Sequence, residues 1–155
     1  MARLAQSVLI IEARFYEDIS NELARGATEE LRRRGIGFER VGVAGVLEVP
    51  LALSAAISSK VLGPQGRHGG CVALGCVIRG ETSHYDIVAI ESARALMDIG
   101  INNSMPLGNG ILTVDNREQA WARASVDSGN KGATAARACA ELMDLASDFS
   151  RKSSR

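Results

Sequence analysis

The segment that most constrains the fold is Cys71–Ile78, an apolar run interrupted only by Gly75. The run is too short for a helix of usual length and contains several β-branched residues. It therefore predicts a strand buried on both faces, as in the interior of a parallel sheet. Arg79-Gly80 ends the run, and from His84 onward apolar residues recur at helical spacing. A strand, a glycine turn and a helix are thus expected within a few residues of one another.

This junction is also a candidate binding site. Ligands of open α/β sheets bind at the carboxyl ends of the strands, and a helix N-terminus there offers free N–H groups and partial positive charge, both suited to phosphate. His84 falls on the same first turn, and histidine can transfer protons near neutral pH. In the alternative interpretation, Thr82 and Ser83 are ordinary helix caps and His84 is a partly exposed helix-start residue. The short motif alone does not separate the two.

The remaining chain alternates strands and helices, which predicts right-handed βα units and a parallel sheet covered on both faces. Strands are expected at residues 7–12, 38–43 and 105–114. Amphipathic helices are expected from about residue 16 to Gly35, over 50–61, from 84 to a loop at 100–104, over 118–123, and after the segment 125–132. The fold class is therefore α/β. We expect one domain over residues 1–155, with about 1–6 and 150–155 flexible.

Length, charge and composition disfavour several classes of function. The chain has 155 residues, enough for one domain with an adequate core. The 18 basic residues balance the 18 acidic ones, so no net field attracts nucleic acid or an anionic membrane. There is no apolar run near the roughly 18 residues of a membrane span, nor an apolar N-terminal stretch typical of a secretory signal. We therefore expect a cytoplasmic protein that binds neither nucleic acid nor membrane.

The cysteines and histidines predict no metal site or disulfide framework. The chain has an odd number of cysteines, and their spacing matches neither a CxxC motif nor a disulfide framework; they are Cys71, Cys76 and Cys139. We interpret them as core residues. His68 and His84 lie in unrelated contexts and do not form a metal-binding pattern.

The stretch RGETSHYD behind the strand VALGCVI resembles the lumazine synthase family. The resemblance extends to ARF near the start, GVLEVP in the first third, GNGILTVD after the middle and GNKGATAA near the end, in the family's order and spacing from about residue 8 to residue 150. It implies a three-layer α/β/α sandwich with a central four-stranded parallel sheet, of flavodoxin-like type. It also implies a transferase that condenses 5-amino-6-(D-ribitylamino)uracil with 3,4-dihydroxy-2-butanone 4-phosphate. The products are 6,7-dimethyl-8-ribityllumazine, phosphate and water, in the penultimate step of riboflavin biosynthesis, with no metal or other cofactor.

The resemblance also implies roles for individual residues. His84 is the proton-transfer residue, and Phe15 stacks on the pyrimidine. Glu48 binds the ribityl chain, since carboxylate oxygens accept hydrogen bonds from hydroxyls. The remaining pyrimidine-site residues are Val46, Leu47, Cys76, Val77, Ile78 and Asn109. The phosphate-binding residues are Gly80, Glu81, Thr82 and Arg123, with Glu81 contributing its backbone.

Two positions depart from the family pattern. Many relatives have phenylalanine at Asn109, where it contacts the pyrimidine from the neighbouring subunit, and lysine at Asp127. The leading interpretation is the enzyme, because a pure binding protein needs neither His84 nor Arg123 and both are present. The two departures leave open an alternative in which the chain is a low-activity flavin- or lumazine-binding protein, or a cage-forming protein, on the same scaffold. A nucleotide-binding α/β module is disfavoured because the chain lacks GxGxxG after its first strand and GxxxxGK[ST] anywhere. The family forms homopentamers that can close into an icosahedral cage of 60 subunits, so we expect a homo-oligomer acting on small molecules.

Overall fold

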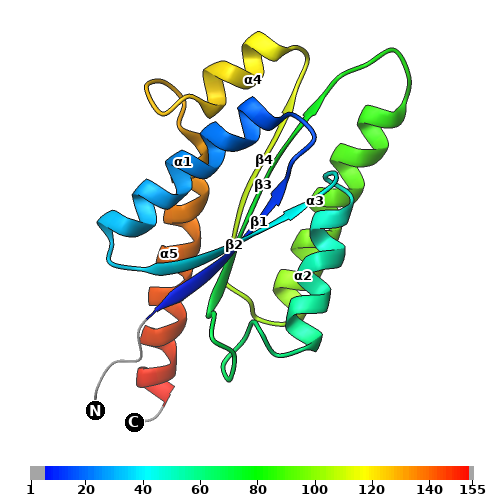
Figure 1. Ribbon diagram of the computed structural model, residues 1–155. Coiled ribbons are helices and arrows are strands. Elements are labelled where there is room, and N and C mark those ends of the chain that lie inside the picture. Colours follow the sequence, from blue (N-terminus) through cyan, green and yellow to red (C-terminus); the bar gives the residue numbers. More distant parts are fainter. Residues whose placement is uncertain (1–5, 154–155) are drawn as a thin grey trace.

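The computed structural model describes residues 6–153, which form a four-stranded parallel sheet between two layers of helices (Figure 1). The strands are ordered β2-β1-β3-β4. Their bounds are β1 (Ser7–Ala13), β2 (Gly37–Val43), β3 (Gly70–Ile78) and β4 (Leu107–Val114). This arrangement confirms the predicted three-layer α/β/α class.

Five helices cover the two faces of the sheet. One face carries α1 (Glu17–Arg33), α4 (Arg117–Ala124) and α5 (Lys131–Ser153), and the other carries α2 (Glu48–Ser58) and α3 (His84–Asn102) (Figure 1). Each face has its own hydrophobic cluster: Ile10 and Leu74 face α1 and α5, whereas Ile11 and Ala73 face α2 and α3. Neighbouring strand residues point to opposite faces, so β1 and β3 are buried on both sides, as the apolar run predicted.

Three helices differ from their predicted bounds by two residues or more. Helix α2 begins at Glu48 rather than Pro50 and ends at Ser58, ahead of Lys60, whose φ is 62°. Helix α3 continues through Gly100 to Asn102, into the predicted loop. The tail from residue 150, expected to be frayed, is helical as far as Ser153. The expected flexibility of residues 1–5, 154 and 155 falls outside the described residues.

The parallel order places the carboxyl ends of all four strands at one edge of the sheet. After β1 the chain continues to β2, which pairs with one side of β1, whereas β3 pairs with the other side. Loops that follow β1 and β3 therefore diverge, and this switch point is where doubly wound sheets bind ligands. Within residues 6–153, no helix is long and apolar enough to cross a membrane.

Candidate active site

An open cavity of about 380 Å³ lies at this switch point. Its walls come from the segments that follow β1, β2 and β3, together with the first turns of α2 and α3. The lining residues are Phe15, Tyr16, Gly45, Val46, Leu47, Glu48, Cys76, Val77, Ile78, Gly80, Thr82, His84, Tyr85 and Val88. Ten of the thirteen residues predicted for the site are in this set, and they come from three separate stretches of sequence.

Glycine at position 75 allows the apolar part of the cavity to close tightly. A Cβ there would lie 3.0 Å from the Cβ of Ala13 and 3.0 Å from Cγ2 of Val46, closer than such atoms normally approach. The glycine that interrupts the apolar run thus leaves room for Val46, which is buried and lines the cavity. Burial also raises the pKa of the neighbouring Cys76 thiol to about 11, so this lining group is a neutral thiol near pH 7.

The turn after β3 presents the N-terminus of α3 to the cavity. Ser83 stands at the N-cap position but makes no side-chain capping hydrogen bond, whereas the His84 N–H donates to Thr82 Oγ1 at 3.3 Å. Gly80 has open space where a Cβ would stand, so the main chain there is accessible to a ligand. Backbone N–H groups, a hydroxyl and the helix dipole converge here, an arrangement suited to an anion such as phosphate.

Arg79 holds this turn in place, a role that the sequence reasoning missed. Its Nε donates to Asp115 Oδ1 at 3.1 Å, just past the end of β4, and its Nη1 lies 3.7 Å from Asp86 Oδ1. Its guanidinium carbon lies 4.3 Å from the centroid of the Tyr85 ring. The hydrogen bond to Asp115 raises the pKa of the Arg79 guanidinium, which keeps it charged. Thr82 lies on the turn between Arg79 and α3. Arg79 therefore links this turn to the segment that follows β4.

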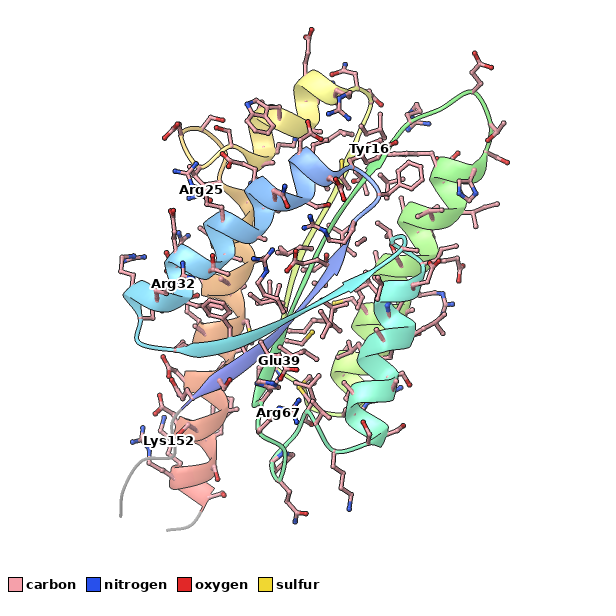
Figure 2. All side chains as sticks on the ribbon, viewed as in Figure 1. Tyr16, Arg25, Arg32, Glu39, Arg67 and Lys152 are labelled. Atoms are coloured by element: carbon pink, nitrogen blue, oxygen red, sulfur yellow. The ribbon has the colours of Figure 1, made fainter. Side chains whose placement is uncertain are left out.

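The opposite wall carries an exposed aromatic ring and a carboxylate. Phe15 is 74% exposed, and its ring meets the Tyr16 ring edge-on, with centroids 4.9 Å apart and planes at 80°. Figure 2 shows Tyr16 near the upper end of the sheet, far from Arg67. Glu48 is the first residue of α2 and is exposed. The cavity thus combines a stacking surface, a hydrogen-bond acceptor and an anion-binding turn.

Three predicted site residues do not line this cavity. Glu81 is exposed on the turn outside it. Arg123 lies on the exposed face of α4, where its Nη1 donates to the carbonyl of Gln119 at 3.1 Å. Asn109, on the edge strand β4, lines a second cavity instead. Conversely, the sequence reasoning missed Tyr16, Gly45, Tyr85 and Val88, although three of these directly adjoin residues that it named.

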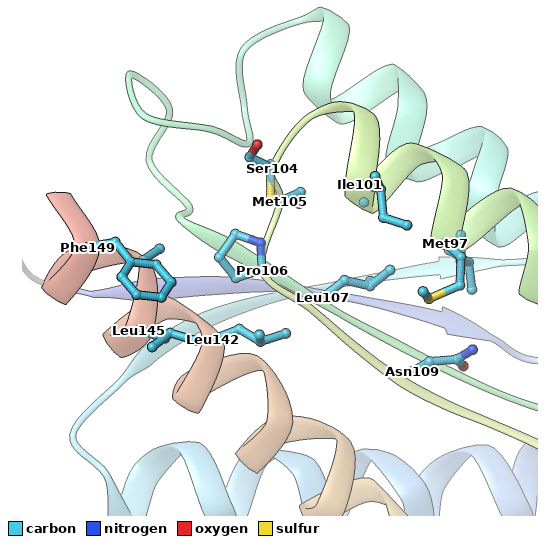
Figure 3. Close-up of a pocket in the computed structure, with 13 residues that line it drawn as sticks. Met97, Ile101, Ser104, Met105, Pro106, Leu107, Asn109, Leu142, Leu145 and Phe149 are labelled. Carbon is cyan, nitrogen blue, oxygen red and sulfur yellow. The ribbon is translucent and has the colours of Figure 1, made fainter. Parts of the chain in front are cut away.

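The second cavity is an apolar groove of about 410 Å³ beside β4 (Figure 3). Met97 and Ile101 of α3 line one side of it, and Leu145 and Phe149 of α5 line the other. Ile101 and Phe149, from helices that flank β4 on opposite faces of the sheet, are 68% and 59% exposed, so the groove presents large apolar side chains to solvent. Asn109 lies at one end of this groove, near Leu107 and Met97 (Figure 3).

The acidic, cysteine and histidine side chains of residues 6–153 form no group of three or more that could hold a metal ion.

Comparison with known proteins identifies the family. The family description 6,7-dimethyl-8-ribityllumazine synthase matches residues 5–147. A 6,7-dimethyl-8-ribityllumazine synthase of Afipia carboxidovorans is 50% identical over 139 residues, covering 89% of this chain and 84% of the relative. The 6,7-dimethyl-8-ribityllumazine synthase 1 of Rhizobium meliloti is 51% identical over 138 residues, covering 89% and 90%. A relative of the same description from Bartonella tribocorum is 48% identical over 142 residues, covering 92% and 91%. This chain belongs to the 6,7-dimethyl-8-ribityllumazine synthase family.

Proposed function

We propose that this chain is a transferase that condenses 5-amino-6-(D-ribitylamino)uracil with 3,4-dihydroxy-2-butanone 4-phosphate. The products are 6,7-dimethyl-8-ribityllumazine, phosphate and water, and the reaction is the penultimate step of riboflavin biosynthesis. The observation that carries the proposal is the cavity itself: an anion-binding turn with His84 faces an exposed aromatic ring and a carboxylate across one cavity. A reaction between a phosphate ester and a hydroxylated aromatic amine requires that combination.

The turn after β3 binds and activates the phosphate substrate. The N–H groups of Gly80 and its neighbours, the Thr82 hydroxyl and the N-terminus of α3 hold the phosphate oxygens. Glu81 contributes its backbone alone, because its carboxylate would repel the anion. His84, on the first turn of α3, lies beside this position and donates a proton as phosphate leaves.

The opposite wall holds the pyrimidine substrate. The Phe15 ring stacks on the heterocycle, and the Glu48 carboxylate accepts hydrogen bonds from the ribityl hydroxyls. Val46 and Leu47, with the segment Cys76–Ile78, form the apolar surface between the two.

Most of the acceleration comes from holding the two substrates together. One amine attacks the ketone and expels a water to form an imine, phosphate is eliminated, and the second amine attacks the remaining carbonyl and closes the ring with loss of a second water. Holding reacting groups in contact can supply a large part of such an acceleration, and proton transfer adds typically about 10²–10⁴-fold.

The decisive experiment mixes the purified protein with both substrates and follows the fluorescence of the lumazine product. We expect product to form in proportion to enzyme, and none with either substrate alone. A protein that binds the product tightly but forms none from the substrates would instead be the low-activity binding protein.

We further propose that the functional unit is a homopentamer with its sites between subunits, open to assembly into a larger cage. Two of the proposed substrate contacts, Asn109 and Arg123, lie away from the cavity of their own chain. A neighbouring subunit docked on the exposed apolar side chains of α3 and α5 would cover the groove beside β4, the end of which carries Asn109. Arg123 of one subunit would then bind the phosphate held by another.

A site shared between subunits predicts that two low-activity variants complement each other when they assemble together. Arg123→Ala and His84→Ala each remove a group from a different side of the interface, so each variant assembled alone is impaired at every site. Subunits mixed under denaturant and reassembled at equal amounts should regain about a quarter of wild-type activity, because that fraction of interfaces pairs an intact Arg123 with an intact His84. Light scattering checks the pentamer, and separately folded variants mixed afterwards serve as the control. Activity in a monomer, or no recovery on reassembly, would contradict the shared site.

We also propose that residues 1–155 act as one functional domain and that the reaction takes place in the cytoplasm. A single continuous four-stranded sheet, with helices on both of its faces, supports a single domain.

A further inference from the structure

A buried carboxylate lies in β1, three residues before Phe15 in the chain. Glu12, the penultimate residue of β1, is 2% exposed. Its Oε2 accepts a hydrogen bond from Arg40 Nε at 2.6 Å, and its Oε1 accepts from Arg40 Nη2 at 3.0 Å and from Arg14 Nη1 at 2.9 Å. A buried charge is costly unless it is paired and hydrogen-bonded in good geometry. Because both oxygens are occupied, Glu12 fixes the two arginines relative to β1.

Arg14 is held from several directions at once. Its backbone N–H donates to the Val43 carbonyl at 3.0 Å, and its Nη2 donates to Asn21 Oδ1 of α1 at 2.5 Å. Its methylene stem lies over Gly42, where a Cβ would stand 3.2 Å from the Arg14 Cγ. Through Arg14, therefore, Glu12 links β1, the end of β2 and the first turns of α1.

The next residue in the chain is Phe15, the proposed stacking surface for the pyrimidine. A ring that is 74% exposed receives little support from packing, so the direction in which it projects depends on the backbone at residues 14 and 15. Beyond Phe15 the backbone is held again, because Ser20 donates its N–H to the Tyr16 carbonyl at 2.8 Å and its hydroxyl to the Ala13 carbonyl at 2.7 Å.

We propose that Glu12 is a positioning residue for the pyrimidine substrate. It acts through Arg14, whose fixed side chain and backbone set the orientation of Phe15 in the cavity. This inference rests on the proposed function, since it assumes that Phe15 stacks on the substrate. It assigns a role in substrate binding to a residue that does not itself reach the cavity.

The test compares Glu12→Gln with a matched control, Glu30→Gln. Glu30 is 5% exposed and also accepts hydrogen bonds from two arginines, Arg33 and Arg34, but it lies near the end of α1 remote from the cavity. Each substitution removes one buried carboxylate held by two guanidinium groups, so general losses of stability are similar.

Glu12→Gln should raise the KM for the pyrimidine substrate about tenfold, with kcat and the KM for the phosphate substrate within about twofold of wild type. Glu30→Gln should leave all three constants near wild type. A second readout is hydrogen exchange at the Arg14 amide, which should accelerate in the Glu12 variant and not in the Glu30 variant.

A double-mutant cycle separates positioning from general support. In a Phe15→Ala background, Glu12→Gln should have almost no further effect on the pyrimidine KM, since there is no ring left to orient. Asn21 is exposed, and Asn21→Ala removes one hydrogen-bond partner of Arg14, so this variant should raise the pyrimidine KM about threefold. The Asn21→Ala measurement also tests the inference if the Glu12→Gln variant does not fold.

The results that would overturn the inference are distinct from those that would overturn the proposed function. If the wild-type protein forms no lumazine, the proposed function fails. If the wild type turns over but Glu12→Gln and Asn21→Ala leave the pyrimidine KM unchanged, or raise both substrate KM values equally, Glu12 has no positioning role. Full additivity with Phe15→Ala leads to the same conclusion.

Discussion

Replacement of His84 with alanine is expected to lower kcat roughly 10–100-fold while leaving pyrimidine binding nearly unchanged. His84 is the first residue of α3 and lines the cavity beside Gly80 and Thr82, where the phosphate substrate is proposed to bind. Loss of the imidazole removes a proton donor for the departing phosphate. The loss is partial because the two substrates remain positioned and water can relay protons.

The measurement is steady-state kinetics with each substrate varied at saturating concentrations of the other, combined with calorimetry for pyrimidine binding. Ser83→Ala is a suitable control, because Ser83 precedes His84 on the same turn, is exposed, makes no side-chain capping bond and does not line the cavity. Its kcat should stay within about twofold of wild type. A His84→Ala variant with wild-type kcat at saturation would make His84 a structural residue at the start of the helix.

The main part of the cavity could be predicted from the sequence because its signals are local. The apolar run of β3, the glycine turn and the helical spacing after His84 lie within one short stretch, and parallel pairing brings the ends of β1 and β2 to the same edge of the sheet. Phe15 lies in the loop after β1, and Glu48 begins the helix that follows β2, so their placement at that end of the sheet needed no knowledge of side-chain packing.

The side chains that support the cavity could not be predicted in the same way. Arg79 pairs with Asp115, 36 residues away, and Arg40 pairs with Glu12, 28 residues away, and no local pattern indicates such partners. A signal for Glu12 did exist, since it is a charged residue inside the apolar strand 7–13, where an ionised group requires a buried partner. The sequence does not specify which arginine provides it.

Two helices extend beyond the ends that the sequence predicts. Gly100 predicts the end of α3, but the helix continues through it to Asn102, and a Cβ at position 100 would have its nearest neighbour, Leu107 Cδ2, 3.5 Å away. The polar tail remains helical because Arg151 pairs with Asp148 one turn earlier, and Arg151 and Lys152 complement the helix dipole in the last turn.

The contact between α1 and α5 gives the largest expected effect on stability. Gly132, in the first turn of α5, packs directly on the main chain of α1: a Cβ at this position would lie 2.0 Å from the Leu23 carbonyl oxygen and 2.9 Å from its carbon. Both atoms belong to a helix backbone and cannot move aside as a flexible side chain can. An added methyl group therefore has to push the two helices apart.

Gly132→Ala is expected to lower the free energy of unfolding by about 3 kcal/mol. The intrinsic preference for alanine over glycine in a helix acts in the opposite direction and alone would raise this free energy by up to about 1 kcal/mol. Separating α1 from α5 also disturbs the cluster that contains Leu23, Ala27 and Ala136. Urea unfolding at one fixed protein concentration measures the change. Gly37→Ala is the control, since its Cβ would find its nearest neighbour at an ordinary 3.7 Å and should change stability by less than about 1 kcal/mol. Equal stability of Gly132→Ala and wild type would mean that the helices can separate at no cost, which is incompatible with close packing at this crossing.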